Sequence, residues 1–238
     1  MRRFYTNVGV GIPKRGSYSI LLDGKSIKTP KRADLVVPSH ELADAIAEEW
    51  RAQGDDIKPS EMYLTKCANS AIDYTAGHEG AVVDGILAYA NDLLCYRAEE
   101  PADLVARQSE TWDPLLDWFE TRFGVKLRTG VGIVHIQQEE AALATLRAAI
   151  AEQNAMVLTA LHAAATICGS LVLALAILEG RLAPDEALAA SRLDEEYQAE
   201  KWGRDASVEL RARALMAELE AAARFMRLAG CVAPSHAT

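Results

Sequence analysis

The sequence predicts an α+β fold, in which a small β-rich N-terminal domain with one helix (residues 1–60) precedes a larger, mostly α-helical domain (residues 61–238). Two observations early in the chain point to this division. Asp23-Gly24 stands between two short apolar runs and is a strong signal for a two-residue β-hairpin. After Ser39, apolar residues recur with the period of an α-helix instead.

A third observation concerns the centre of the helical domain. The segment Ala155–Leu178 carries no Asp, Glu, Lys or Arg over 24 residues, which is long enough to cross a bilayer. Its many small residues, and the lack of aromatic or basic anchors at its ends, favour a buried core helix over a membrane span. Cys168-Gly169-Ser170 is a place where this helix can divide into two short ones, because glycine costs about 1 kcal/mol relative to alanine inside a helix.

The first domain is expected to hold short strands followed by one helix. Aromatic and β-branched residues predict the strands, and Ser39 is a suitable N-cap for the helix. A polar segment that contains Pro59 marks the end of the domain. The predicted strands are Phe4–Val10, Tyr18–Leu22, Lys25–Lys28 and Leu35–Pro38.

The second domain is expected to be helical apart from a short isolated hairpin near residues 125–136, around Thr129-Gly130. Proline at helix starts and glycine after helix ends set several boundaries. Pro114 is expected to end or kink a helix. The predicted helices are Thr65–Thr75, Glu79–Asn91, Pro101–Trp112, Leu115–Arg122, Glu139–Ala151, Ala155–Leu178, Pro184–Gly203 and Asp205–Leu228.

Charge is distributed unevenly along the chain. The net charge is −9, yet residues 1–32 hold eight basic residues and one acidic residue, while the remainder holds 17 basic and 33 acidic residues. This pattern predicts two differently charged surfaces, which are either solvated or used by partners. A net acidic chain is a poor candidate for binding nucleic acid. Four scattered cysteines without a C-x-x-C pair fit a reducing compartment, and we see no secretory signal.

No stretch of the sequence shows an assembled active site. Gly24-Lys25-Ser26 resembles the end of a phosphate-binding loop, but position 19 lacks the required glycine. The five histidines form no zinc motif, and no G-x-S-x-G nucleophile motif occurs. We therefore expect no enzyme activity, no cofactor and no metal. The alternative is an enzyme whose site is assembled in space from scattered residues such as Asp92, Cys95, Arg97 and His162.

The densest polar cluster, Leu193–Asp205, follows the apolar segment. Five acidic residues stand there beside Tyr197 and Trp202. Carboxylates at this density need cations nearby, either within the chain or on a partner. A solvated acidic helix face and a binding surface account for this pattern equally well.

Short motifs along the chain occur in the order that they have in one protein family. They are Arg3-Phe4-Tyr5, Leu22-Asp23-Gly24, Lys28-Thr29-Pro30, Glu49–Gln53, Asp92–Arg97, Gln108, Trp112-Asp113-Pro114, Gly169-Ser170-Leu171, Leu175-Ala176, Glu196-Tyr197-Gln198 and Trp202–Asp205. Together they make the chain resemble the assembly chaperones for the α subunit of the catalytic head of F-type ATP synthase, which occur in mitochondria and α-proteobacteria. The resemblance runs from residue 3 to about residue 228.

The resemblance implies a non-enzymatic chaperone that binds the unassembled α subunit and promotes its assembly with the β subunit. It also implies a β-rich N-terminal domain and a helical C-terminal domain. The residues that we expect to bind the partner are Asp194, Glu195, Glu196, Glu200, Trp202 and Asp205. Trp50, Trp112, Asp113 and Pro114 belong to matching motifs and serve either packing or binding, and the place of Trp50 in an apolar repeat favours packing.

We expect a monomer without an integral membrane segment. A peripheral membrane protein would need a basic amphipathic helix, and none is evident, although the basic residues within 1–32 are candidates for contact with a second partner. Mitochondrial members of the family begin with a transit peptide, whereas this chain starts almost directly at its first predicted strand. We therefore expect a bacterial, cytoplasmic protein, or a protein of the mitochondrial matrix if the chain is a processed eukaryotic form.

Overall fold

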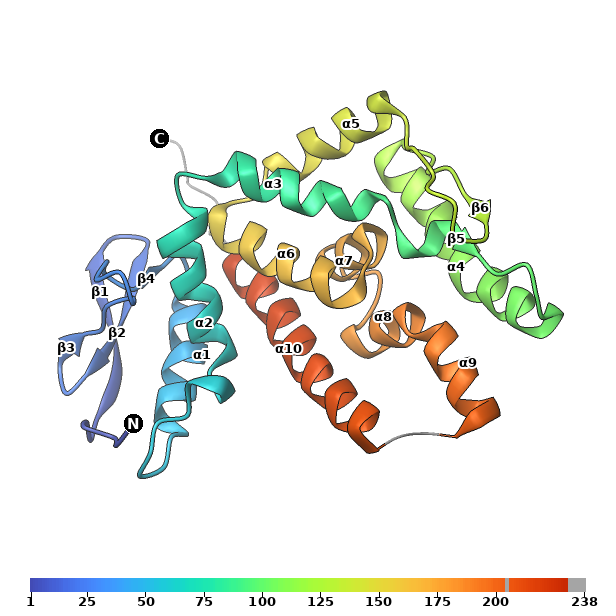
Figure 1. Ribbon diagram of the computed structural model, residues 1–238. Helices are drawn as coiled ribbons and strands as arrows, with labels where there is room; N and C mark the ends of the chain where they lie inside the picture. The colour runs from blue at the N-terminus through green and yellow to red at the C-terminus, as the bar shows by residue number, and fades with distance from the viewer. Residues whose placement is uncertain (204–205, 231–238) are drawn as a thin grey trace. The chain divides into compact units, whose positions relative to one another are not determined.

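The computed structural model describes residues 1–203 and 206–230, in which a small strand region precedes a mostly helical remainder (Figure 1). The predicted α+β class is confirmed. The chain divides into two compact units. Unit 1 comprises Met1–Glu79, Asn154–Ala160 and the described chain from Arg224 onward, and unit 2 comprises Gly80–Gln153 and Leu161–Ala223. The domain boundary near residue 60 stays a prediction, which limited proteolysis can test.

Within its described residues, unit 1 contains a four-stranded sheet around a central strand, β2 (Ser17–Leu22). Three strands pair with β2 in antiparallel fashion: β1 (Val8–Lys14), β3 (Lys25–Ser26) and β4 (Val36–Val37). The Asp23-Gly24 turn joins β2 to β3 as predicted. Both of its residues have a positive φ, 48° and 80°, as a two-residue hairpin of type I′ requires.

The first strand begins at Val8, so the prediction that it starts at Phe4 was wrong. The residues before it pair with a different part of unit 1, since the Arg3 amide donates a hydrogen bond to the Asp55 carbonyl oxygen at 2.8 Å. At its other end the strand continues into a second tight turn, where Gly16 has a φ of 73°. Phe4 itself is exposed, and the neighbouring Tyr5 is buried without being part of a strand.

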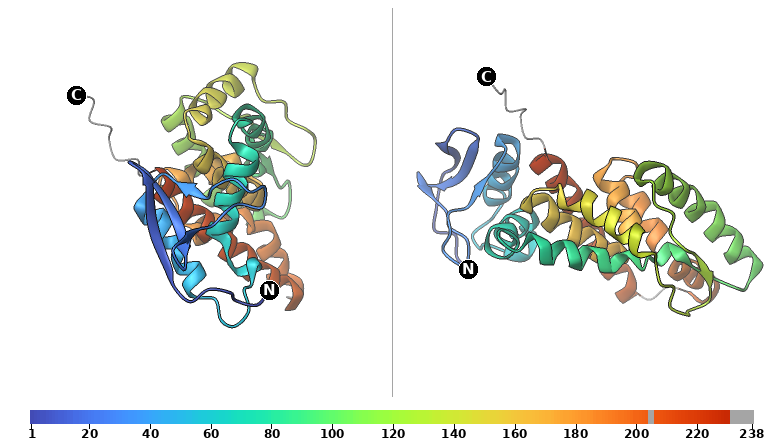
Figure 2. Two further views of the ribbon diagram at one scale, coloured as in Figure 1. Left: turned by 90° about the vertical axis from the view of Figure 1, so that its left-hand side faces the viewer. Right: turned by 90° about the horizontal axis from the view of Figure 1, so that it is seen from above.

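Helix α1 (His40–Arg51) packs on the sheet, and Figures 1 and 2 show it alongside the strands. Ser39 caps this helix as predicted, because its side-chain oxygen accepts a hydrogen bond from the Leu42 amide at 3.1 Å. Trp50 in the last turn packs on a buried cluster. The cluster consists of Tyr5, Leu22, Ile57 and Met62.

Unit 1 continues through a 3₁₀ turn at Pro59–Glu61, helix α2 (Tyr63–Ser70) and a π-helical turn at Ala71–Thr75. The last two together span the whole of the helix predicted over Thr65–Thr75. A hydrogen bond of 2.7 Å joins the hydroxyls of Thr75 and Thr159, and the latter lies in the first turns of α6 (Ala155–Cys168).

Unit 2 is built around a short apolar helix, α7 (Leu171–Leu178), of which every residue up to Ile177 is buried. It packs against α4 (Ala102–Phe123) and α8 (Pro184–Ser191). The other helices of the unit, in whole or in part, are α3 (Glu79–Leu87), α5 (Glu140–Ala151), α6, α9 (Leu193–Trp202) and α10 (Ala206–Gly230). Two 3₁₀ turns, Ala88–Ala90 and Leu93–Cys95, and a parallel pair of short strands, β5 (Tyr96–Arg97) and β6 (Gly130–Val131), complete it.

The uncharged segment Ala155–Leu178 forms two helices, with the break where it was predicted. Gly169 follows α6 with a φ of 61°, a left-handed conformation that glycine adopts without strain. Ser170 then starts α7, since its side-chain oxygen accepts a hydrogen bond from the Leu173 amide at 3.0 Å. No helix in the described part of the chain is long and apolar enough to cross a membrane.

Two predictions about helix continuity were wrong. α4 runs through Pro114 as one helix, because Trp112 before the proline and Phe119 after it are both buried and hold the turn that lacks a hydrogen bond. Conversely, the helix predicted over Pro184–Gly203 breaks at Arg192, whose φ and ψ of −107° and 16° are not helical.

The hairpin predicted near residues 125–136 was also wrong. β6 lies there, but it pairs in parallel with β5, and no partner strand follows it within the segment. Gly130 does not form a hairpin turn. It lets the Ile136 side chain lie close to the backbone, because a Cβ at position 130 would stand only 3.1 Å from Cδ1 of Ile136. The β-branched run that suggested a second strand forms a loop.

Candidate functional site

The acidic cluster lies on α9, which follows α8 after the break at Arg192 (Figure 1). Asp194, Glu195 and Glu196 occupy the first turn of α9, and Lys201 occupies the last turn. Negative charge at the N-terminus of a helix and positive charge at its C-terminus each stabilise an exposed helix by roughly 0.3–1 kcal/mol. The charge pattern therefore supports this short helix in the absence of a partner.

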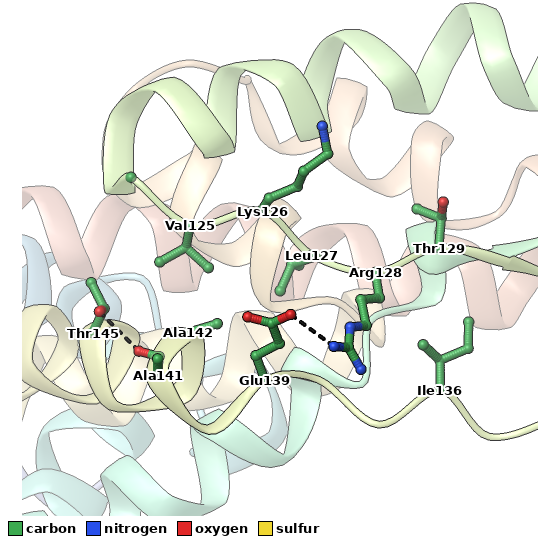
Figure 3. A pocket seen from close by; sticks show the side chains of 11 residues that line it. Val125, Lys126, Leu127, Arg128, Thr129, Ile136, Glu139, Ala141, Ala142 and Thr145 are labelled. Atoms are coloured by element: carbon green, nitrogen blue, oxygen red, sulfur yellow. Dashed lines mark hydrogen bonds and ion pairs between the residues drawn. The ribbon is translucent and has the colours of Figure 1, made fainter.

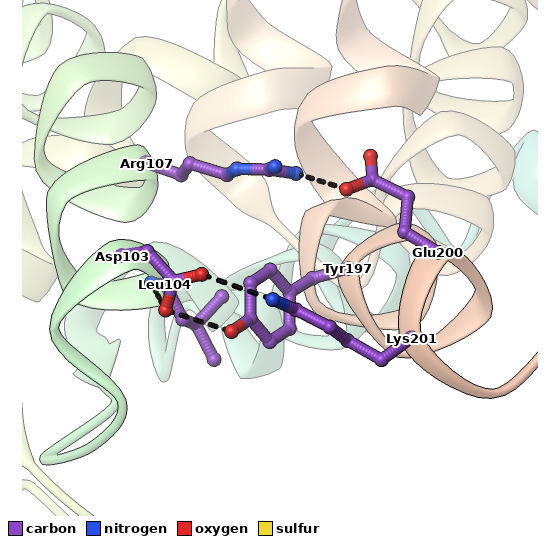
Figure 4. A network of polar contacts seen from close by, with 6 residues as sticks. All are labelled: Asp103, Leu104, Arg107, Tyr197, Glu200 and Lys201. Atoms are coloured by element: carbon purple, nitrogen blue, oxygen red, sulfur yellow. Dashed lines mark hydrogen bonds and ion pairs between the residues drawn. The ribbon is translucent and has the colours of Figure 1, made fainter.

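One face of α9 is attached to α4 by polar contacts (Figure 4). The Tyr197 hydroxyl donates a hydrogen bond to Asp103 Oδ1 at 2.7 Å, and Lys201 Nζ lies 3.3 Å from Asp103 Oδ2. The hydrogen bond from Tyr197, supported by Lys201, lowers the pKa of Asp103, while burial and the contact with Asp103 raise the pKa of Tyr197. Within α9, all of which is described, only Tyr197 is buried.

Two carboxylates that we expected to bind a partner take part in this attachment. Asp194 accepts a hydrogen bond from Gln108 Nε2 at 2.7 Å, and Glu200 forms an ion pair with Arg107 at 2.8 Å. Both of these partners lie on α4, and Figure 4 shows Arg107 and Glu200 pointing toward one another. Asp194 and Glu200 thus fix the position of α9, and any contact of theirs with another protein stays a prediction.

The other face of α9 is open. The Glu195 side chain is 63% exposed although it pairs with Arg192 at 2.7 Å, and Trp202 is 80% exposed. A groove of about 350 Å³ lies between α9 and the start of α10. Its lining includes Glu195, Glu196, Gln198, Trp202, Val208 and Glu209. Carboxylates, an indole ring and an aliphatic side chain therefore share one accessible surface, which we call the α9 groove.

The Trp112-Asp113-Pro114 motif supports this surface from within α4. Trp112 is 1% exposed, and its Nε1 donates a hydrogen bond to the Ala190 carbonyl oxygen at 2.9 Å, which ties the last turn of α8 to α4. Asp113 pairs with Arg97 at 2.7 Å. Among the other predicted site residues, Trp50 packs in unit 1, and Asp205 lies outside the described residues.

Asp92, the first residue of the alternative enzyme hypothesis, is a completely buried capping group. Its carboxylate accepts hydrogen bonds from the amides of Leu94 and Val172 at 3.0 and 2.8 Å, and from the Ser170 hydroxyl at 3.0 Å. Two of these donors lie at the start of α7. Burial raises the pKa of Asp92 to about 6. A carboxylate that is enclosed and occupied in this way is suited to holding α7 and not to meeting a substrate.

The remaining residues of that hypothesis make separate local contacts. Burial raises the pKa of the Cys95 thiol to about 12, which leaves it protonated and unreactive. Arg97 pairs with Asp113, and the ring of His162 lies 6.3 Å from that of Tyr89. Burial also lowers the pKa of His162. No group of three His, Cys, Asp or Glu side chains in the described residues is placed to hold a metal ion.

The known proteins that this chain resembles in sequence and in fold agree with one another. Residues 2–120 match the family model described as ATP12 chaperone protein. The chain belongs to the ATP12 chaperone family. The crystal structure of Atp12 from Paracoccus denitrificans superposes on it with a TM-score of 0.90 and 42% identity, over 96% of this chain and 98% of that one. A point mutant of the same protein matches equally well, with a TM-score of 0.90.

Two further relatives of the ATP12 family extend the comparison. The Atu1473 protein of Agrobacterium tumefaciens has a TM-score of 0.92 and 38% identity, over 95% of this chain and 85% of that one. Mitochondrial protein atp12 of Schizosaccharomyces pombe is 27% identical over 215 residues, which are 85% of this chain and 74% of that protein. The family resemblance drawn from the motifs is thus confirmed, and the chain is a chaperone of ATP synthase assembly.

Several residues that hold α9 or line its groove were not predicted from the sequence. Asp103 and Arg107, which hold α9, stood out in no motif, although Gln108 beside them did. The Tyr197–Asp103 bond joins residues 94 positions apart, so no local pattern could reveal it. Val208, which lines the α9 groove from α10, is an ordinary aliphatic residue of a long helix and gave no signal.

Proposed function

We propose that this ATP12-family chaperone binds the α subunit of the ATP synthase catalytic head before assembly, and that it promotes assembly with the β subunit by binding alone, without catalysis. The family assignment supports the role of a chaperone. The accessible groove on α9 supports this helix as the surface that contacts the α subunit. An unassembled subunit exposes surface that the finished head buries, and such surface aggregates. A partner that covers it until the β subunit arrives would prevent this.

The α9 groove has the chemistry for a reversible contact. Glu195 and Glu196 attract and orient a basic surface, which speeds encounter. Trp202 offers the kind of aromatic side chain that often supplies binding energy at interfaces. A polar, hydrated interface of this kind can form and dissociate, as a chaperone requires. Asp205 extends the proposed surface, while Asp194 and Glu200 contribute by holding α9.

The proposal also covers the remaining motif residues, the oligomeric state, the cellular location and nucleic acid. Trp50 and Trp112 act through packing, since Trp50 packs on the buried cluster of unit 1 and Trp112 is buried between α4 and α8. Asp113, which pairs with Arg97, and Pro114 are exposed on α4, and the proposal keeps both a structural and a binding role for them. The chaperone works as a monomer in the cytoplasm, or in the mitochondrial matrix if the chain is a processed eukaryotic form. It binds no nucleic acid, since its acidic charge would repel phosphates.

Co-expression with the α and β subunits, followed by pull-down, tests this function. We expect the chain to capture isolated α subunit and to leave assembled α–β heads in solution. Capture of neither form would refute the proposed function, and capture of assembled heads would refute the role before assembly.

Charge reversal tests the surface itself. Glu196→Lys should weaken capture of the α subunit by about tenfold, because charge complementarity is lost at the groove, and should leave the circular dichroism melt nearly unchanged. Glu220→Lys is a matched control, since it makes the same charge change at an exposed position of α10. Equal weakening by both variants, or collapse of the melt in Glu196→Lys alone, would exclude Glu196 as a binding residue.

A further inference from the structure

A loop of unit 2, residues 130–136, presents aliphatic side chains directly to solvent. The side chains of Val131, Ile133 and Val134 are 61%, 98% and 78% exposed. Isolated exposed apolar residues are common on proteins. Three of them within four residues form a patch, and such a patch usually marks a contact with another molecule. We call Ile133 and Val134 the loop tip.

The base of this loop is anchored. β6 pairs with β5, and the Gly132 amide donates a hydrogen bond to the Arg97 carbonyl oxygen at 2.9 Å. On the returning side, the Ile136 amide donates to the Tyr96 hydroxyl at 3.2 Å. Gly132 has a φ of 82°, which few other residues would adopt. The two sides of the loop are therefore fixed on β5, while its tip is left without apolar neighbours.

The surroundings of the loop decide between a protein and a membrane as its partner. Residues 129–137 contain no Asp, Glu, Lys, Arg, Phe, Tyr or Trp, and their one titratable side chain is that of His135. The nearest flanking cations are neutralised, since Arg128 pairs with Glu139 at 2.7 Å and Lys126 with Glu120 at 3.4 Å. Figure 3 shows the side chains of Arg128 and Glu139 pointing toward each other near Ile136. All three residues line a groove of about 590 Å³. Loops that enter membranes rely on free Lys or Arg residues and on Trp or Tyr anchors, and this loop has none of these four residue types.

The loop tip is too small to hold two copies of the chain together by itself. Two aliphatic side chains offer far less area than the roughly 1,200 Å² that a stable protein interface buries. The tip must therefore belong to a larger contact surface. Figures 1 and 2 show β6 and α9 toward the same end of unit 2.

We propose that residues 130–136 form a client-contacting loop, whose tip packs against apolar interface surface of the unassembled α subunit. This inference rests on the proposed function and adds to it an apolar contact distinct from the acidic α9 groove. The division of work is physically reasonable: the groove supplies attraction and orientation, while the loop covers surface that would otherwise aggregate.

The test compares three variants of the full chain in binding isolated α subunit, measured by pull-down and by suppression of light scattering from aggregating α. Ile133→Ser/Val134→Ser should weaken binding about tenfold or more. Ile133→Leu/Val134→Leu should bind like the wild type, because it keeps the apolar area. Ile12→Ser is the matched control, since Ile12 is an exposed aliphatic residue of unit 1.

A second measurement covers the case in which the serine variant alters the fold. A photo-crosslinking residue in place of Ile133 should join the chain to the α subunit, whereas one in place of Ile12 should not. If the wild type captures the α subunit but the serine variant captures it equally well and no crosslink forms, the loop proposal fails while the proposed function stands. If the wild type captures no α subunit, the proposed function fails. Binding of the loop to phosphatidylglycerol vesicles, or loss of self-association in the serine variant, would also overturn the proposal.

Discussion

Asp92 gives a prediction whose size follows from its surroundings. It is completely buried, and burial raises its pKa from an ordinary 3.8 to about 6. The folded protein therefore holds the Asp92 proton more tightly than the unfolded chain does. The stability that results is fully present below pH 3.8 and is lost as the pH rises through about 6.

The expected magnitude can be worked out from these two pKa values. A pKa of about 6 in the folded protein, against 3.8 in the unfolded chain, corresponds to about 3 kcal/mol in the free energy of unfolding over the whole pH range. Between pH 5 and pH 7.5 the same relation gives a loss of about 1.4 kcal/mol. Asp92→Asn removes the titration, because the amide stays neutral at every pH in this range.

The assay is urea unfolding of dilute wild type and Asp92→Asn, followed by circular dichroism at several values between pH 5 and pH 7.5. Subtracting one unfolding free energy from the other removes the titration of groups common to both proteins. We expect the wild type to lose about 1.4 kcal/mol relative to the variant as the pH rises. A constant difference across the range would refute the reasoning, and a difference of the opposite sign would show that the hydrogen bonds from Leu94, Ser170 and Val172 outweigh the cost of burial.

Two further predictions concern α9 and the break before α7. Tyr197→Phe should raise the pKa of Asp103 toward its ordinary value, because the hydrogen bond that lowers it is lost; an NMR titration of the carboxyl carbon that shows no change would contradict this. Gly169→Ala should destabilise the fold by about 1 kcal/mol, or roughly 2–4 °C in Tm, because alanine is strained at a φ of 61°. Gly80→Ala in α3, where a Cβ meets nothing within 4 Å, is its control and should leave Tm unchanged or raise it.

The parts of the fold that local chemistry determines were predictable from the sequence. The Asp23-Gly24 turn needs residues that tolerate a positive φ, and the Ser39 cap needs a hydroxyl before an apolar repeat. Gly169 marked a break in an uncharged helix because glycine is unfavourable inside a helix, and its φ of 61° agrees with that break. Each of these features depends on a few adjacent residues.

The predictions that were wrong concern features that depend on tertiary contacts. Pro114 is a strong helix breaker, yet burial of Trp112 and Phe119 on both sides keeps α4 continuous. Nothing at Arg192 is unfavourable to a helix, so the break between α8 and α9 could not be seen in advance. The run Val131–Ile136 has strand composition, but the only strand that pairs with it within the described residues is β5, more than 30 residues earlier.

The candidate site was predictable in composition but not in geometry. The sequence shows that residues 193–205 are acidic with two aromatic residues. It does not show that Asp194 and Glu200 face α4 while Glu195 faces solvent. That division depends on Gln108 and Arg107, which lie about 90 residues away in the chain.

The attachment of α9 to α4 has a consequence for how this helix responds to force or to a partner. Apart from the Tyr197 ring, the contacts described between the two helices are ion pairs and hydrogen bonds. Exposed ion pairs exchange with water at a net cost of about 0–1 kcal/mol each. α7 differs, because separating it from its neighbours would expose a row of aliphatic side chains. Local unfolding should therefore open α9 more readily than α7, and the amides of α9 should exchange hydrogen well before those of α7.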